Sequence, residues 1–201
     1  MSPENSQASA RSPWGHVRWG RFAAIMVPSA VAAAVLIGLT SAGAVGASIS
    51  VSGRAYEVTA SQLRGSGFEQ FGKVVTSRSA DHPVALSAIR YAKITNLCQS
   101  VSVGGFTMLL RAGTGKTPVS ADNLIVDADQ LSGTATFHNI AIGQDASTLT
   151  EDPGTTGQAG AFGEQADSIT IDNLRQHTWL TTAGTFTLPG LRLTVSHGGT
   201  C

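Results

Sequence analysis

The chain has 201 residues, with 13 lysine or arginine and 13 aspartate or glutamate side chains, so its formal net charge is zero. The basic residues are scattered and are not interleaved with aromatic side chains, which argues against nucleic-acid binding. The only two cysteines lie far apart in the sequence, which excludes a redox pair or a zinc site built on Cys-x-x-Cys.

The N-terminal segment has the pattern of a secretory signal. Residues 1–21 are polar and contain three arginines, residues 22–39 carry no charge, and the small-residue segment 44–47 ends before Ser48. The alternative is an uncleaved membrane anchor, because the apolar run is about long enough to span a bilayer. In both cases positive charge ahead of the apolar run keeps the N-terminus inside. The protein is therefore expected outside the cytoplasm, either secreted or held at the cell envelope by residues 22–39.

Signal or anchor would occupy residues 1–47, which leaves 154 residues (48–201), enough for a single domain with its own core. Cys98 and Cys201 both belong to that part. In an oxidising compartment two cysteines are expected to form one disulfide, which would tie the chain end to the first half. Two free thiols, or a bond between chains, are the alternatives.

From Ser48 onward the sequence is typical of an all-β protein. Small and β-branched residues dominate, and no long window has apolar residues at helical spacing. Alternating patterns at residues 56–61, 106–111 and 166–172 indicate strands, and each half offers about four. Residues 145–163 are rich in Gly, Thr, Asp and Glu and predict a long surface loop. The fold class expected is all-β, preceded by an N-terminal signal or anchor helix.

An internal repeat organises this region. Residues 58–65 and 126–133 share Val, Ala, Gln, Leu and Gly at five of eight positions, and shorter matches follow in the same order: residues 94–97 with 171–174, and 106–107 with 186–187. The pattern predicts two repeats, at about 48–117 and 118–201. They would form a two-repeat curved sheet or a short β-solenoid. A break in the alternation predicts a turn or bulge at residues 62–65 and again at 130–133.

Charge is distributed unevenly between these halves. Residues 48–117 carry eight basic and three acidic side chains, a balance of +5, whereas residues 118–201 carry two basic and nine acidic ones, a balance of −7. The asymmetry is explained either by attraction within one domain or by electrostatic self-association, with the basic half of one chain against the acidic half of the next.

The sequence contains no complete motif for catalysis, for cofactor binding or for metal binding. Residues 113–117 (GTGKT) resemble a phosphate loop, but Leu110 occupies the position of the first glycine and Pro118 follows, so we expect a hairpin turn. The Gly-x-Ser-x-Gly pentapeptide of serine hydrolases is missing. Asp127 and Asp129 could hold calcium weakly, but a solvated strand face explains them better. We therefore predict no catalytic, cofactor-binding or metal-binding residues.

A lipid is the partner that the composition favours. Trp179 and the apolar strand residues are most simply core. Aromatic residues make up only 6% of the chain, and alanine and glycine are abundant. A curved sheet that does not fill its own interior would leave an apolar groove, which suits an acyl chain.

Residues 21–28, 94–100, 165–168 and 181–186 resemble an uncharacterised exported family of streptomycetes and their actinobacterial relatives. The resemblance covers essentially the whole chain. Members of that family sometimes carry the name "cholesterol esterase", which nothing in these residues supports because the nucleophile motif is missing. Such proteins are often encoded beside a small multi-spanning membrane protein, so the resemblance implies export, the disulfide and an envelope partner, and adds no mechanism.

The function predicted from the sequence is that of a non-catalytic exported cell-envelope protein with a structural or lipid-binding role. The alternative is a secreted lipid-ester hydrolase. The two are distinguished by whether a serine lies within hydrogen-bond reach of a histidine.

Overall fold

A computed structural model describes residues 53–152 and 154–201, which belong to one compact unit of the chain, Ile49–Cys201. The predicted signal peptide or anchor (residues 1–47) lies outside the described residues. Within them, no helix is long and apolar enough to cross a membrane. The only helical element found there is a short 3₁₀ turn, η1 (Ala146–Thr148).

The described residues form nine strands, which confirms the all-β expectation. The first half supplies four strands, as expected, and the second half supplies five. Four strands are long: β1 (Tyr56–Thr76), β2 (Asp81–Thr95), β5 (Val119–His138) and β7 (Phe162–Thr182). Five are short: β3 (Leu97–Val103), β4 (Phe106–Ala112), β6 (Ala141–Asp145), β8 (Thr185–Thr187) and β9 (Arg192–Ser196).

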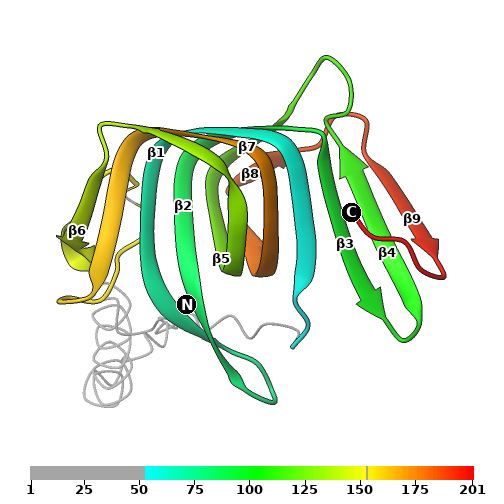
Figure 1. Ribbon diagram of the computed structural model, residues 1–201, viewed down its shortest axis with the longest axis horizontal. Helices are drawn as coiled ribbons and strands as arrows, with labels where there is room; N and C mark the ends of the chain where they lie inside the picture. The colour runs from blue at the N-terminus through cyan, green and yellow to red at the C-terminus, as the bar shows by residue number, and fades with distance from the viewer. Residues whose placement is uncertain (1–52, 153) are drawn as a thin grey trace, which may run out of the picture. The chain divides into compact units, whose positions relative to one another are not determined.

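The four long strands close into a ring, in which each of them pairs with two others. β1 pairs with β2, β2 with β5, β5 with β7, and β7 pairs back onto β1, always antiparallel (Figure 1). Each half of the chain contributes two of these strands. The result is one closed antiparallel sheet. Of the two architectures expected, the structure is closer to the curved sheet and does not show a solenoid.

Three short strands extend this sheet to one side, and we call β3, β4 and β9 together the wing. β3 continues from β2 and pairs with the beginning of β1, β4 pairs with β3, and β9 pairs with β4. In Figure 1 the wing lies to the right of the long strands. A disulfide joins Cys98 on β3 to Cys201, which is 103 residues later in the chain.

The break in alternation on β1 involves neither the turn nor the bulge predicted at residues 62–65. The register between β1 and β2 runs without a shift from Gln62 to Ser66. Ser61 lies between Asn96, the bend that follows β2, and Asn173 of β7, and the Asn96 side-chain amide donates to the Ser61 hydroxyl at 2.8 Å. Both asparagines have φ of 55°, in the left-handed region that asparagine tolerates better than most residues. One such residue lies on each side of Ser61, where the inward phase of β1 changes, so that both Val58 and Leu63 line the cavity.

The matching prediction for β5 is confirmed. The register between β5 and β7 shifts between Asp127 and Ala128, between Ala128 and Gln130, and again between Ser132 and Thr134. Asn96 and Asn173 occupy equivalent positions of the second sequence match, residues 94–97 and 171–174. Their common conformation agrees with a duplication, which itself stays a prediction.

Two connecting segments were singled out in the sequence, one as a long loop and one as a hairpin turn. Residues 146–161 form the predicted long loop, and Ala146 packs with Phe71, Leu86 and Ala88 in a cluster separate from the main core. The segment 113–118 is not the hairpin turn expected, because it connects β4 to β5 and those two strands do not pair. The amide of Gly113 donates to the carbonyl of Pro189 at 2.8 Å.

Candidate functional site

The closed sheet surrounds an apolar cavity of about 80 Å³. All four long strands contribute to its walls. The polar side chains among them are few: Gln70, Ser87, Gln99, Gln176 and Thr181. The apolar walls include Val58, Leu63, Phe68, Ile89, Leu124 and Val126.

The cavity opens to solvent beside the second half of β5. Leu131 and Phe186 line the cavity and are nevertheless 47% and 38% exposed. Ala135, which follows Leu131 on the same face of β5, also lines the cavity and is exposed. A cavity whose wall residues reach the surface is accessible to a ligand from outside.

The face that lines the cavity continues onto the wing without interruption. Val58 of β1 pairs with Gln99 of β3, and Gln99 pairs in turn with Leu110 of β4. Leu110 pairs with Leu193 of β9. Directly opposed residues of antiparallel strands lie on the same face of a sheet. The interior of the closed sheet and one face of the wing are therefore a single surface.

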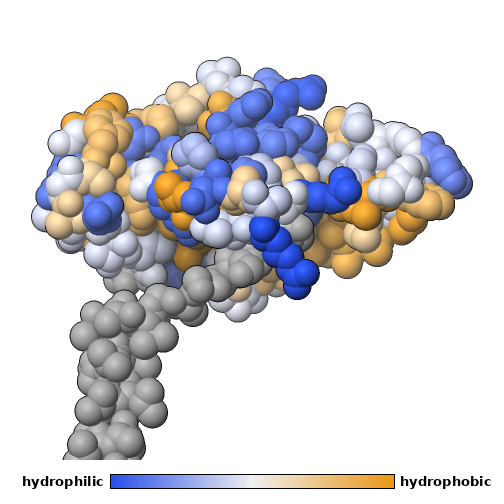
Figure 2. Space-filling model, turned by 90° about the horizontal axis from the view of Figure 1, so that it is seen from below, coloured by the Kyte–Doolittle hydropathy of each residue, from blue (hydrophilic) through white to orange (hydrophobic). Residues whose placement is uncertain are grey.

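That face of the wing is apolar and open. Its exposed side chains come from all three strands. They are Val103, Phe106, Met108, Leu193 and Val195, each between 45% and 62% exposed. Figure 2 shows a corresponding orange patch at its right-hand end, where Figure 1 places β3, β4 and β9.

The opposite face of the wing is mostly polar, and the chain's own C-terminal tail covers part of it. After β9 the chain returns to β3, where Cys201 is bonded to Cys98 and its amide donates to the Ser100 hydroxyl at 3.3 Å. Ser100 and Thr107, both on this polar face, are each only 4% exposed. Contiguous exposed apolar patches mark interaction sites in soluble proteins, so the apolar face of the wing is a candidate binding surface.

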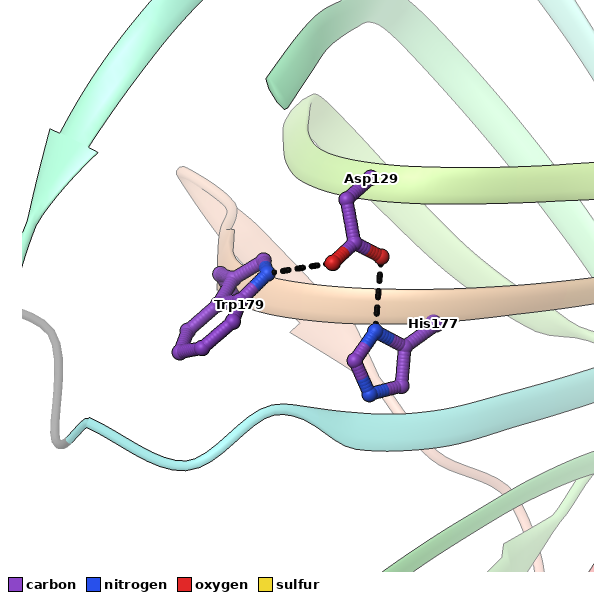
Figure 3. Close-up of polar contacts among 3 residues, drawn as sticks. All are labelled: Asp129, His177 and Trp179. Carbon is purple, nitrogen blue, oxygen red and sulfur yellow. Dashed lines mark hydrogen bonds and ion pairs between the residues drawn. The ribbon is translucent and has the colours of Figure 1, made fainter. Parts of the chain in front are cut away.

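Asp129 of β5 contacts two aromatic residues of β7, His177 and Trp179 (Figure 3). One carboxylate oxygen accepts from the Trp179 indole N–H at 2.9 Å, and the other is 2.6 Å from His177 Nδ1. The Trp179 ring also stacks on His82, with centroids 3.6 Å apart. Burial alone would raise the pKa of Asp129, but the hydrogen bonds from Trp179 and His177 and the charge of His177 lower it below its ordinary value.

One serine lies within hydrogen-bond reach of a histidine. Ser77 Oγ is 3.2 Å from His82 Nε2, in the turn between β1 and β2. The same oxygen accepts from the amides of Ser79 and Ala80 at 3.3 and 3.1 Å, and Ser77 is only 7% exposed. These contacts are those of a hydroxyl that closes a turn. Ser77 is also absent from the cavity lining.

Asp127 is buried, which corrects the expectation that Asp127 and Asp129 form a solvated strand face. It is completely inaccessible to solvent, and Lys73 Nζ lies 2.9 Å from its carboxylate. Apart from this ion pair, neither carboxylate oxygen has a partner among the described residues. The register of β5 shifts between Asp127 and Ala128, so the two aspartates do not share one face of the strand.

A second buried carboxyl anchors the long loop. Glu69 accepts from the amide of Asp152 at 2.6 Å and from the Thr155 hydroxyl at 3.4 Å, and both Glu69 and Asp152 are buried. Burial raises the pKa of Glu69 above its ordinary value, the amide of Asp152 opposes this, and the Asp152 carboxylate adds to it. The sequence carried a weak signal for this site, because Glu69 and Gln70 are flanked by Phe68 and Phe71.

Across residues 53–152 and 154–201, no group of three or more His, Cys, Asp or Glu side chains is placed to hold a metal ion. The two residues singled out from the sequence, Cys98 and Cys201, form a disulfide that fastens the chain end to β3 of the wing. Sequence reasoning missed Ser77, whose contacts lie within the β1–β2 turn, and Lys73, whose partner Asp127 lies on β5.

The fold and cavity define an all-β protein with an apolar interior that is open to solvent. The chain matches the family of unknown function DUF6230 over residues 52–201, and it belongs to that family. Neither a curated protein nor a solved structure matches it.

Proposed function

We propose that this protein is a non-catalytic lipid-binding protein of the cell envelope, and that its ligand is an acyl chain. The observation that carries the proposal is the apolar cavity whose lining continues onto the open face of the wing. An acyl chain has no groups that need hydrogen bonds, so a surface of this composition suits it.

The size of the cavity limits how much of a ligand it holds. At about 80 Å³ it is smaller than the engineered cavity of about 150 Å³ that accepts benzene, and far below the roughly 300 Å³ at which pockets for whole small molecules begin. The end of one acyl chain fits. The remainder would leave through the mouth beside Leu131 and Phe186 and lie along apolar surface.

Export is part of the proposal. It is supported by the basic segment, the apolar run 22–39 and the small residues before Ser48. A Cys98–Cys201 disulfide also fits an oxidising compartment. The intact mass of the protein recovered from culture tests export. A chain that begins at Ser48 supports secretion, and a membrane-bound chain that still contains residue 1 supports the anchor. A chain found in the cytoplasm contradicts both.

Binding is tested with decanoate, measured by displacement of the fluorescent probe anilinonaphthalene sulfonate. Ser87 lines the cavity, so Ser87→Leu fills it and is expected to weaken decanoate binding at least tenfold. Ser132→Leu makes the same substitution at an exposed position that does not line the cavity and is expected to leave binding unchanged. Equal binding by both variants, or none by the wild-type chain, would contradict the proposal.

The second candidate, a secreted lipid-ester hydrolase, is favoured by one observation, the contact between Ser77 and His82. Hydrolysis of p-nitrophenyl decanoate by wild-type protein and by Ser77→Ala decides between the two. We expect the two proteins to give the same rate, because the Ser77 oxygen closes a turn and is buried. A hydrolytic activity that disappears with Ser77→Ala, while His138→Ala retains it, would establish the hydrolase instead.

A further inference from the structure

The outer edge of β9 is an unprotected strand edge. β9 pairs with β4 along one side, in a register without shifts, and has no partner along the other side among the described residues. All five of its residues are exposed, and it contains neither proline nor lysine. Of the features with which natural proteins shield such edges, β9 has only its shortness and Arg192; it has no lysine, proline, bulge or covering segment among the described residues. In Figure 1 β9 is the outermost strand of the wing.

The sequence of β9 is complementary to itself when two copies run antiparallel. In the register that pairs all five residues, the two-fold axis passes beside Thr194, which faces its own copy. Arg192 then lies opposite Ser196, and Leu193 opposite Val195, so that no two like charges meet. Leu193 and Val195 are 57% and 62% exposed in the single chain and would contact each other across the pair.

We propose that a second copy of this chain adds to the wing through β9, so that two wings form one continuous six-stranded sheet. The two-fold axis is perpendicular to that sheet, and both apolar wing faces therefore lie on the same side. The apolar surfaces that lead to the two cavities become one surface. The contact depends on the β9 edge and goes beyond lipid binding by a single chain.

The contact is weak in solution. Five paired residues form a marginal unit by themselves, and each favourable cross-strand pair adds only about 0.2 to 1 kcal/mol. It also differs from the head-to-tail association that the charge asymmetry predicts, because it is isologous and closes after two copies. Two chains held on the same lipid would meet at a higher effective concentration.

The register is tested by placing a glutamate at each of two edge positions that share one face of β9. Thr194→Glu puts two carboxylates opposite each other, whereas Ser196→Glu puts a carboxylate opposite Arg192 of the second copy. By sedimentation equilibrium of the exported chain, we expect the dimer dissociation constant to rise about twofold to fivefold with Thr194→Glu and to fall by a similar factor with Ser196→Glu. Opposite shifts are specific to this register, since general damage to β9 would move both variants the same way.

Cysteine capture gives an independent readout. Mild oxidation of Thr194→Cys is expected to yield a disulfide-linked dimer, and Ser196→Cys is expected to stay monomeric, because its opposite residue is Arg192. Equal crosslinking of the two variants, or no dimer at any concentration, would overturn the proposal. So would a dimer that Thr194→Glu leaves intact and Met108→Asp abolishes, since that contact would lie on the apolar face. Decanoate binding is measured separately, so failure of the dimer does not decide the proposed function.

Discussion

Val58 at the start of β1 lies opposite Gln99 at the start of β3, and this pairing joins the interior of the closed sheet to the wing. Both side chains line the cavity. Because directly opposed residues share a face, the apolar side of the wing is an extension of the cavity wall. A ligand that leaves the cavity can therefore remain in contact with apolar surface.

The disulfide is expected to contribute a large part of the stability. Cys98→Ser with Cys201→Ser removes a bond that closes a loop of 103 residues. The chain-entropy model gives a loss of about 4.7 kcal/mol in the free energy of unfolding. Urea unfolding measures it. A loss confined to the wing, with an unchanged transition for the rest, would show instead that the wing unfolds by itself.

Lys73 is expected to contribute to the stability of the folded protein, because it is the only partner of the buried Asp127 carboxylate among the described residues. Lys73→Met leaves that charge uncompensated and should lower the free energy of unfolding by about 2 to 3 kcal/mol, less than for a fully buried pair because the Lys73 side chain is 35% exposed. The double variant with Asp127→Val should recover most of the loss. Lys116→Met, in the exposed segment after β4, is the control and should change stability little. Equal losses for the two lysine variants would contradict the assignment.

Glu69 predicts a pH dependence of stability. Its pKa is raised in the folded protein by burial, so the folded state holds this proton more tightly than the unfolded state. The stabilisation is present below the ordinary glutamate pKa and is lost as the pH rises through the raised value. Glu69→Gln cannot ionise and keeps the acceptor for the Asp152 amide. It should match the wild type near about pH 4 and exceed it at about pH 7 in urea unfolding.

The control for that comparison is Glu57→Gln, because Glu57 is exposed at the start of β1. It should follow the wild type at every pH. If Glu69→Gln is instead less stable than the wild type at neutral pH, the ionised carboxylate is the form that holds the loop.

Asp129 predicts the opposite pH dependence. Its pKa is lowered in the folded state despite partial burial, because Trp179 and His177 bond to the ionised carboxylate. Its stabilisation is therefore present above the ordinary aspartate pKa and is lost as the pH falls through the lowered value. Asp129→Asn should reduce the free energy of unfolding by about 1 kcal/mol at neutral pH and by less in acid. Trp179 fluorescence reports directly on this contact, and an unchanged spectrum in Asp129→Asn would contradict it.

Local patterns in the sequence carried much of the fold. Alternation at residues 56–61 and 106–111, together with the absence of helical spacing, predicted strands that the structure contains in β1 and β4. The composition of residues 145–163 predicted the long loop, and the mismatch of phase before Gly133 predicted the irregular register of β5. These features depend on residues that are close in the sequence, so they can be predicted without knowledge of the fold.

Other features follow from contacts between segments far apart in the sequence, and these were decided only by the tertiary structure. The change of phase at Ser61 needs Asn96 and Asn173 on its two sides, and the burial of Asp127 needs Lys73 from another strand. No local pattern encodes the pairing of β7 with β1 that closes the sheet. The sequence by itself determined the strands, the loop and the expectation of an apolar surface. The closure, which turns that surface into a cavity continuous with the wing, arose from long-range backbone pairing that composition and periodicity do not specify.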